Sequence, residues 1–197
     1  MASESTTSQW AREYLVKPHH ELGRAGPVCP YVHGSMDRGS FFLGVCPGDP
    51  DHSAVHSLLM RYRDWFLELD PRPPSSAQLK TILITFPDLP PDRVPEVIDA
   101  TQRQLKPHYV SQGLMIGEFH PGPPDKGGLW NKDFRPLWCP VPVLAIRNLV
   151  PTDFPFLAEE SRFVQTYLMR IGDAVPEHLR QAVAEARLKY GLTSDKT

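Results

Sequence analysis

Residues 113–147, which read GLMIGEFHPGPPDKGGLWNKDFRPLWCPVPVLAIR, decide both the fold and the position of a functional site. The stretch opens with an apolar run, residues 114–116, that is typical of a buried strand. The ladder stops at His120-Pro121, because proline has no backbone N–H to continue it. A loop rich in glycine and proline then leads to a second apolar run, residues 141–146. Ligands of sheet proteins bind beyond strand ends, so we expect a ligand site in this loop.

The loop and the strand ends carry side chains that suit a ligand: Glu118, His120, Trp130, Asn131, Arg135, Trp138 and Cys139. Side chains alternate along a strand, which predicts that Glu118 and His120 face the same way. Two kinds of chemistry fit these two residues. The imidazole either binds a metal or moves a proton, and the carboxylate orients it or binds a cationic substrate. The plain alternative is a polar loop with a surface histidine.

The composition of the whole chain indicates a globular protein. Of its 197 residues 41% are hydrophobic and 22% are charged, with a net charge of −2. This charge gives no electrostatic case for binding nucleic acid or an anionic membrane. No apolar run approaches the ~20 residues that a membrane span needs, and the first residues lack a signal core. We therefore expect a cytoplasmic protein and a single domain over residues 1–197, with 1–6 and 194–197 disordered.

Hydrophobic periodicity predicts an α/β (α+β) fold with the element order α-β-α-β-α-β-β-α-α. One four-stranded, mostly mixed sheet packed by helices is the simplest arrangement of these elements. Asp49 is the expected N-cap of the clearest helix, because Pro50 follows it in the first helical position. Helices are expected over 7–16, 49–70, 91–107, 159–171 and 176–190, and strands over 40–46, 79–86, 113–119 and 141–146.

All three cysteines precede a proline, at Cys29, Cys46 and Cys139. At this proline content chance alone gives such a set roughly once in a thousand chains. Cys-Pro dipeptides occur where a thiolate binds heme iron, and thiolate is an established axial ligand. The alternative is that strands end at prolines and that buried cysteines lie at those ends. No CxxC or HExxH pair supports a structural zinc site.

Four segments resemble heme-dependent N-hydroxylases of the arginine N-hydroxylase and guanitoxin-pathway type. PVCPYVHGSMDRGSFFLGV is similar to that family's Pro-Cys segment with its short strand, and GLMIGEFHP to its apolar strand ending in Gly-x-His-Pro. FRPLWCPVPVLAIRNLVPTDFPFL and FVQTYLMRIGD resemble its later strand and helix. The likeness spans residues 27–172. The chain is also similar to an actinobacterial family of unknown function associated with specialised metabolism.

The resemblance implies a heme-binding enzyme, a heme-dependent oxidoreductase that carries out N-hydroxylation or another N-oxidation of a small amine-containing metabolite. His120 is then the first choice of iron ligand and Cys29 the rival. Arg135 is expected to pair a heme propionate, with Arg38 as a weaker choice. Trp130 and Trp138 are expected to enclose the macrocycle.

One departure from that family leaves other functions open. The sequence Gly-Glu-Phe-His places the carboxylate of Glu118 two residues before the histidine. The alternatives are a non-catalytic protein that binds heme or a small metabolite, and a cofactor-free enzyme that uses Glu118 and His120 as acid and base. The expected partner is a small-molecule substrate, with no nucleic acid and no membrane. The oligomeric state stays open, with a homodimer as one option.

Overall fold

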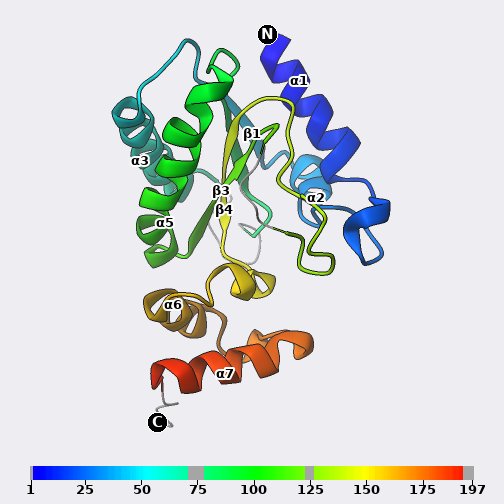
Figure 1. Cartoon of the computed structure of the whole chain (residues 1–197), viewed down its shortest axis with the longest axis vertical. Helices are drawn as coiled ribbons and strands as arrows, with labels where there is room; N and C mark the ends of the chain where they lie inside the picture. Colours follow the sequence, from blue (N-terminus) through cyan, green and yellow to red (C-terminus); the bar gives the residue numbers. More distant parts are fainter. Residues whose placement is uncertain (1, 71–77, 123–126, 193–197) are drawn as a thin grey trace. The chain divides into compact units, whose positions relative to one another are not determined.

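The computed structural model describes residues 2–70, 78–122 and 127–192, and it contains one four-stranded sheet in the order β1-β2-β4-β3 (Figure 1). The pair β1 and β2 is parallel, and the pair β2 and β4 is antiparallel, so the sheet is mixed, as the sequence predicts. The strands are β1 (Phe41–Val45), β2 (Thr81–Thr85), β3 (Leu114–Phe119) and β4 (Val143–Asn148).

The direction of β3 follows from hydrogen bonds at both of its ends. The N–H of Leu149, just after β4, donates to Gly113 O at 2.9 Å, just before β3. At the other end, the N–H of Cys139 donates to His120 O at 3.3 Å. The end of β4 therefore lies beside the start of β3, and these two strands run antiparallel. It follows that β1, β2 and β3 all end at the same edge of the sheet.

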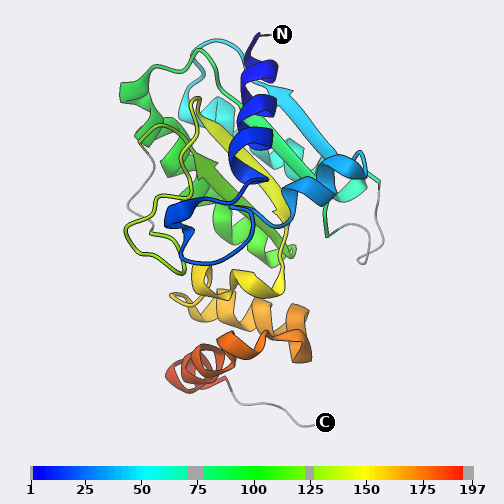
Figure 2. The same ribbon diagram turned by 90° about the vertical axis from the view of Figure 1, so that its right-hand side faces the viewer.

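Helices cover both faces of the sheet. Figure 1 shows α3 and α5 on one face and α1 and α2 on the other, and Figure 2 shows α1 lying across its face. Two helices thus precede β1 where the sequence predicts one, and the first begins earlier than residue 7. The helical segments of this part of the chain are α1 (Ala2–Trp10), η1 (Ala11–Leu15), η2 (His20–Leu22), α2 (Val32–Asp37), α3 (His52–Glu68), η3 (Pro91–Arg93), η4 (Pro95–Asp99) and α5 (Ala100–Ser111).

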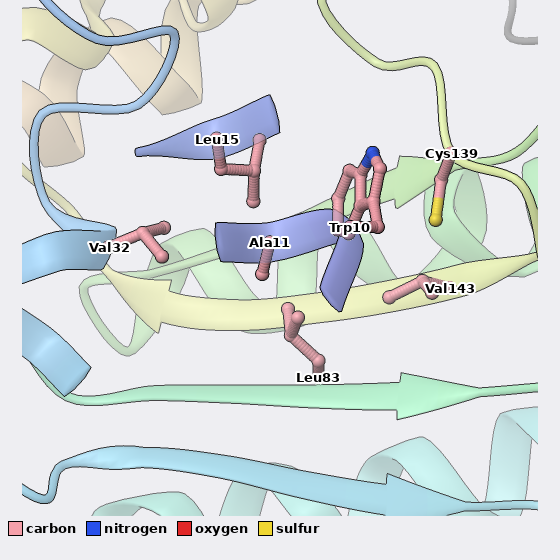
Figure 3. Close-up of a cluster of buried hydrophobic side chains, with 7 residues drawn as sticks. All are labelled: Trp10, Ala11, Leu15, Val32, Leu83, Cys139 and Val143. Carbon is pink, nitrogen blue, oxygen red and sulfur yellow. The ribbon is translucent and has the colours of Figure 1, made fainter. Parts of the chain in front are cut away.

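The face under α1 has a compact apolar core (Figure 3). The side chains of Trp10 in α1 and Leu15 in η1 pack against Leu83 of β2 and Val143 of β4. All four residues are at most 4% exposed. The indole N–H of Trp10 also donates to the Trp138 carbonyl at 3.0 Å. The N-terminal helix is therefore fixed to the loop that leads into β4.

The N-cap of helix α3 is a different residue from the predicted one. Asp51, in extended conformation, accepts a hydrogen bond from Ala54 N at 2.7 Å and is the N-cap. Asp49, the predicted cap, instead pairs with Arg93. A cap must immediately precede the first helical residue, and the helix starts at His52, two residues later than its proline suggests.

The other end of α3 is closed by a lysine. Lys80 is 2% exposed, and its ammonium donates to Phe66 O at 2.5 Å and to Leu69 O at 2.6 Å. These carbonyls have no partner within the helix, and the cation also opposes the negative end of the helix dipole. A buried lysine is stable here because its charge is hydrogen-bonded.

The chain divides into two compact units. Residues 1–106 with 115–148 form the first unit, and 107–114 with 149–197 form the second. The second unit contains η5 (Pro151–Phe156), α6 (Ser161–Ile171), η6 (Gly172–Ala174), η7 (Glu177–Leu179) and α7 (Arg180–Tyr190). Within it the phenol of Tyr167 donates to Pro151 O and that of Tyr190 to Glu159 O, each at 2.6 Å. The expected disordered end, 194–197, lies outside the described residues.

Gly44→Ala tests how closely α3 approaches β1. A Cβ at position 44 would lie 2.6 Å from the Tyr62 hydroxyl and 3.3 Å from its ring carbon. We expect a loss of about 1–3 kcal/mol in the free energy of unfolding, the usual cost of overpacking. Adding Tyr62→Phe should recover part of that loss, because it removes the clashing oxygen. Urea unfolding of the three variants measures this, and an unchanged midpoint for Gly44→Ala would contradict the close approach.

Candidate functional site at the strand ends

The loops that follow β1 and β2 are bound to each other at the edge where the strands end. The N–H of Gly48 donates to Asp88 Oδ2 at 2.8 Å, and Arg93 pairs with Asp49. The hydrogen bond that Arg93 donates to the Asp49 carboxylate raises the pKa of Arg93 above its ordinary value. These two contacts join the loops and give this edge a defined shape.

His120 lies at the same edge, directly after β3. Its backbone bridges to the segment before β4: the N–H of His120 donates to Leu137 O at 3.2 Å, and His120 O accepts from Cys139 N. The residue is only 3% exposed. The histidine that the sequence singled out is therefore part of the folded interior, which corrects the alternative of a surface histidine.

The imidazole of His120 pairs with a carboxylate that the sequence did not predict. Its Nε2 lies 3.0 Å from Asp99 Oδ1, and the two side chains are 4% and 14% exposed. Asp99 is the last residue of the π-helical segment η4 (Pro95–Asp99). A π-turn holds more residues than an α-turn, so the ordinary helical period does not show which way Asp99 faces. The clue to the orientation of Asp99 is that this charged residue directly follows Val97 and Ile98, which are both buried.

Glu118 and His120 share a face of β3, as strand alternation predicts. Both are buried, with Glu118 2% exposed, whereas the intervening Phe119 is half-buried. Phe119 points the other way, where its ring lies 5.4 Å from the Trp10 ring of α1. Glu118 also takes part in a hydrogen-bonding or electrostatic interaction within the protein. A carboxylate, an imidazole and a second carboxylate thus belong to one end of the sheet.

The aromatic and basic residues expected around a heme lie in the loop but are engaged locally. The Arg135 guanidinium donates to Lys132 O at 2.7 Å, within its own loop. Trp138 is 44% exposed and its ring lies 6.1 Å from that of Tyr14, while Trp130 is 51% exposed. The half-buried phenol of Tyr14 has its pKa raised to about 12 by desolvation and by nearby Glu21. None of these contacts directs the loop side chains toward His120.

Cys29 and Arg38 belong to the opposite face of the sheet from His120. Cys29 packs against the apolar core under α1, and its N–H donates to Leu15 O at 2.8 Å. Arg38 ends α2 and donates to Gly34 O at 3.4 Å. The two alternative iron ligands are therefore separated by the sheet, because His120 faces Asp99 on the side of α5.

Two hollows in the described part of the chain hold about 210 Å³ each, and neither is lined by His120, Glu118 or Cys29. Ligand pockets usually hold roughly 300–1,000 Å³. In residues 2–70, 78–122 and 127–192 no three histidine, cysteine or acidic side chains form a metal site. His120 and Asp99 are thus paired, whereas the side-chain contacts described for Arg135 and Trp138 do not reach His120.

Fold and site together define an α/β protein that holds a buried carboxylate–histidine pair where its parallel strands end. The family model described as a domain of unknown function, DUF6875, matches residues 4–182, and the chain belongs to this family. No curated protein and no solved structure gives a significant match. Among the described helices, none has the length and apolar character to cross a membrane.

The thiol at the entry to β4 should be inert. Burial raises the pKa of Cys139 to about 12, and the residue is 0% exposed. A raised pKa leaves the thiol neutral below that pH, and the thiolate is the reactive form. We expect iodoacetamide at about pH 8 to leave Cys139 unmodified in the folded protein and to modify it in urea. Peptide mass spectrometry gives both rates, and equal rates would contradict the burial.

Proposed function

We propose that this protein is an enzyme that moves a proton on a small amine-containing metabolite, with His120 as the acid or base. The observation that carries the proposal is the buried hydrogen bond between His120 Nε2 and Asp99 Oδ1, at 3.0 Å. Cyclisation and hydrolysis are reactions of this class. The sequence offered Glu118 as the group that orients the histidine, whereas the hydrogen bond to its ring comes from an unpredicted pairing with Asp99.

The pairing gives each residue a separate task. The carboxylate of Asp99 accepts the Nε2–H, which fixes the ring and leaves Nδ1 as the nitrogen that takes a substrate proton. When His120 becomes protonated, Asp99 stabilises the imidazolium. A positioned general acid or base accelerates a reaction by about 10²–10⁴-fold. Asp99 is thus a positioning residue, and His120 is the catalytic one.

Glu118 favours a cationic substrate. It lies on the same face of β3 as His120, and the two are buried together. A carboxylate binds an ammonium or guanidinium group by charge-assisted hydrogen bonds, each contributing about 1.5–3 kcal/mol. A further polar group supports a polar ligand at this end of the sheet. The buried hydroxyl of Thr101, near the start of α5, has no hydrogen-bond partner in the described structure.

Turnover of a metabolite mixture tests the proposal without a known substrate. Purified protein is incubated with a small-molecule extract, and mass spectrometry records which compounds are consumed. We expect His120→Gln to slow the reaction by about 10²-fold or more, and Asp99→Asn by about tenfold or more. His33→Gln is the matched control, since this exposed histidine pairs with Asp37 across one helical turn. Wild-type rates in folded His120→Gln would refute the proposal.

Heme binding through His120 is a second proposal, favoured by the same pair. A metal-ligating histidine usually donates its other N–H to a carboxylate, as Asp99 allows here. The Cys-Pro set and the resemblance to heme-dependent N-hydroxylases also support it. If bound, heme would supply oxidative chemistry, and His120 would hold the iron through Nδ1.

Absorbance distinguishes the two proposals. On the heme proposal, protein expressed with added heme carries about one heme per chain, and His120→Ala changes the Soret band more than Cys29→Ala does. On the acid–base proposal, the protein turns over its substrate without any Soret band. A heme spectrum that survives His120→Ala and is lost in Cys29→Ala would assign the iron to the thiolate.

A further inference from the structure

The outer edge of β1 presents backbone groups that no described strand uses. Thr81 N donates to Ser40 O and Cys46 N to Thr85 O, each at 2.9 Å, so the even-numbered residues of this strand point toward β2. Because backbone groups alternate in direction along a strand, Phe41, Leu43 and Val45 point their N–H and C=O groups outward. These three form the outer edge of β1.

The sequence of β1 does not protect this edge. Natural edge strands are blocked by charged side chains, prolines or bulges. The strand reads FFLGV, without a charge or a proline, and it pairs with β2 in unbroken register. Within residues 2–70, 78–122 and 127–192, no backbone hydrogen bond reaches Phe41, Leu43 or Val45 from outside the sheet. Such an edge is a template for another strand.

Apolar side chains flank the outer edge of β1 on both faces. On the α3 face Tyr62 covers Gly44, and the half-exposed Trp65 packs against Tyr62 with ring centroids 5.1 Å apart. On the other face Phe41 and Leu43 are partly buried against the apolar core under α1, beside Met36. The edge therefore suits a strand that carries its own apolar side chains, rather than a polar small molecule.

We propose that the outer edge of β1 pairs with β1 of a second copy of this chain, antiparallel about a two-fold axis at Leu43. In this register Phe41 of one copy lies opposite Val45 of the other. The backbone of each of these residues donates one hydrogen bond and accepts one. A two-fold interface must be self-complementary. The two ends of β1 meet this condition, because they carry opposite charges. Exposed Arg38 precedes β1, and Asp49 follows it with a side chain 46% exposed. The antiparallel register brings Arg38 beside Asp49 of the second copy.

Sedimentation velocity of the full chain tests the proposal, over protein concentrations from about 1 to about 100 μM, where weak dimers dissociate. We expect a concentration-dependent dimer. Val45→Pro removes an outward N–H from each copy without breaking a bond to β2, and it should weaken the dimer by at least about tenfold. Arg38→Glu, which leaves the strand unchanged, should weaken it as well, less so at high salt. This second variant keeps the test decisive if Val45→Pro does not fold.

Leu188→Lys is the control, because Leu188 is 83% exposed and lies on α7 in the second unit. It should leave the dimer unchanged. Amide exchange by NMR adds a direct readout: the amides of Phe41, Leu43 and Val45 should gain protection as concentration rises, while those of Phe42 and Gly44 stay protected throughout. A monomer at every concentration would overturn the proposal. So would a dimer that Leu188→Lys dissociates, or one in which the three outward amides exchange freely.

Discussion

Strand β2 is enclosed on all sides, and this constraint shapes the rest of the first unit. All five of its residues are buried, and it bonds to β1 on one edge and β4 on the other. A strand in that position needs helices on both faces of its sheet, since either face would otherwise expose Ile82, Leu83 or Ile84. The helices on one face come from the loops after β1 and β2, and those on the other come from the N-terminus. The strand ends are left at the edge, where Asp99 and His120 meet.

Much of the fold follows from local patterns in the sequence. The four strands lie within a few residues of the apolar runs that predict them, because these runs are short and bounded by proline, glycine or charge. The helix α2 is the exception within the first unit. Its segment contains Gly34 and lies between prolines and glycines, yet Val32 and Ser35 are buried against the sheet. Tertiary burial stabilises a helix of six residues that local propensity does not favour.

The site was predictable only in part, for a geometric reason. Strand alternation has a fixed period of two, so Glu118 and His120 could be assigned to one face from their spacing. Asp99 lies in a π-turn, where the helical period fails, and its contact with His120 joins residues 21 apart in sequence. Arg135 shows the reverse relation between sequence distance and contact. Arg135 is close to His120 in sequence, but it bonds to a carbonyl three residues away, and a local bond of this kind costs little ordering entropy.

The pairing of β2 with β4 also governs how the chain reaches this structure. Thr85 pairs with Val143 and Thr81 with Arg147, so the two central strands are separated by about 60 residues of sequence. Closing a loop of that length precedes any gain from the contacts it brings together, and non-local pairing slows folding. Helices α3 and α5 form from local contacts, and α3 can cover β1 before β4 arrives. During synthesis on the ribosome, the backbone groups of β2 that face β4 therefore stay unpaired until Val143 has been synthesised and has left the exit tunnel.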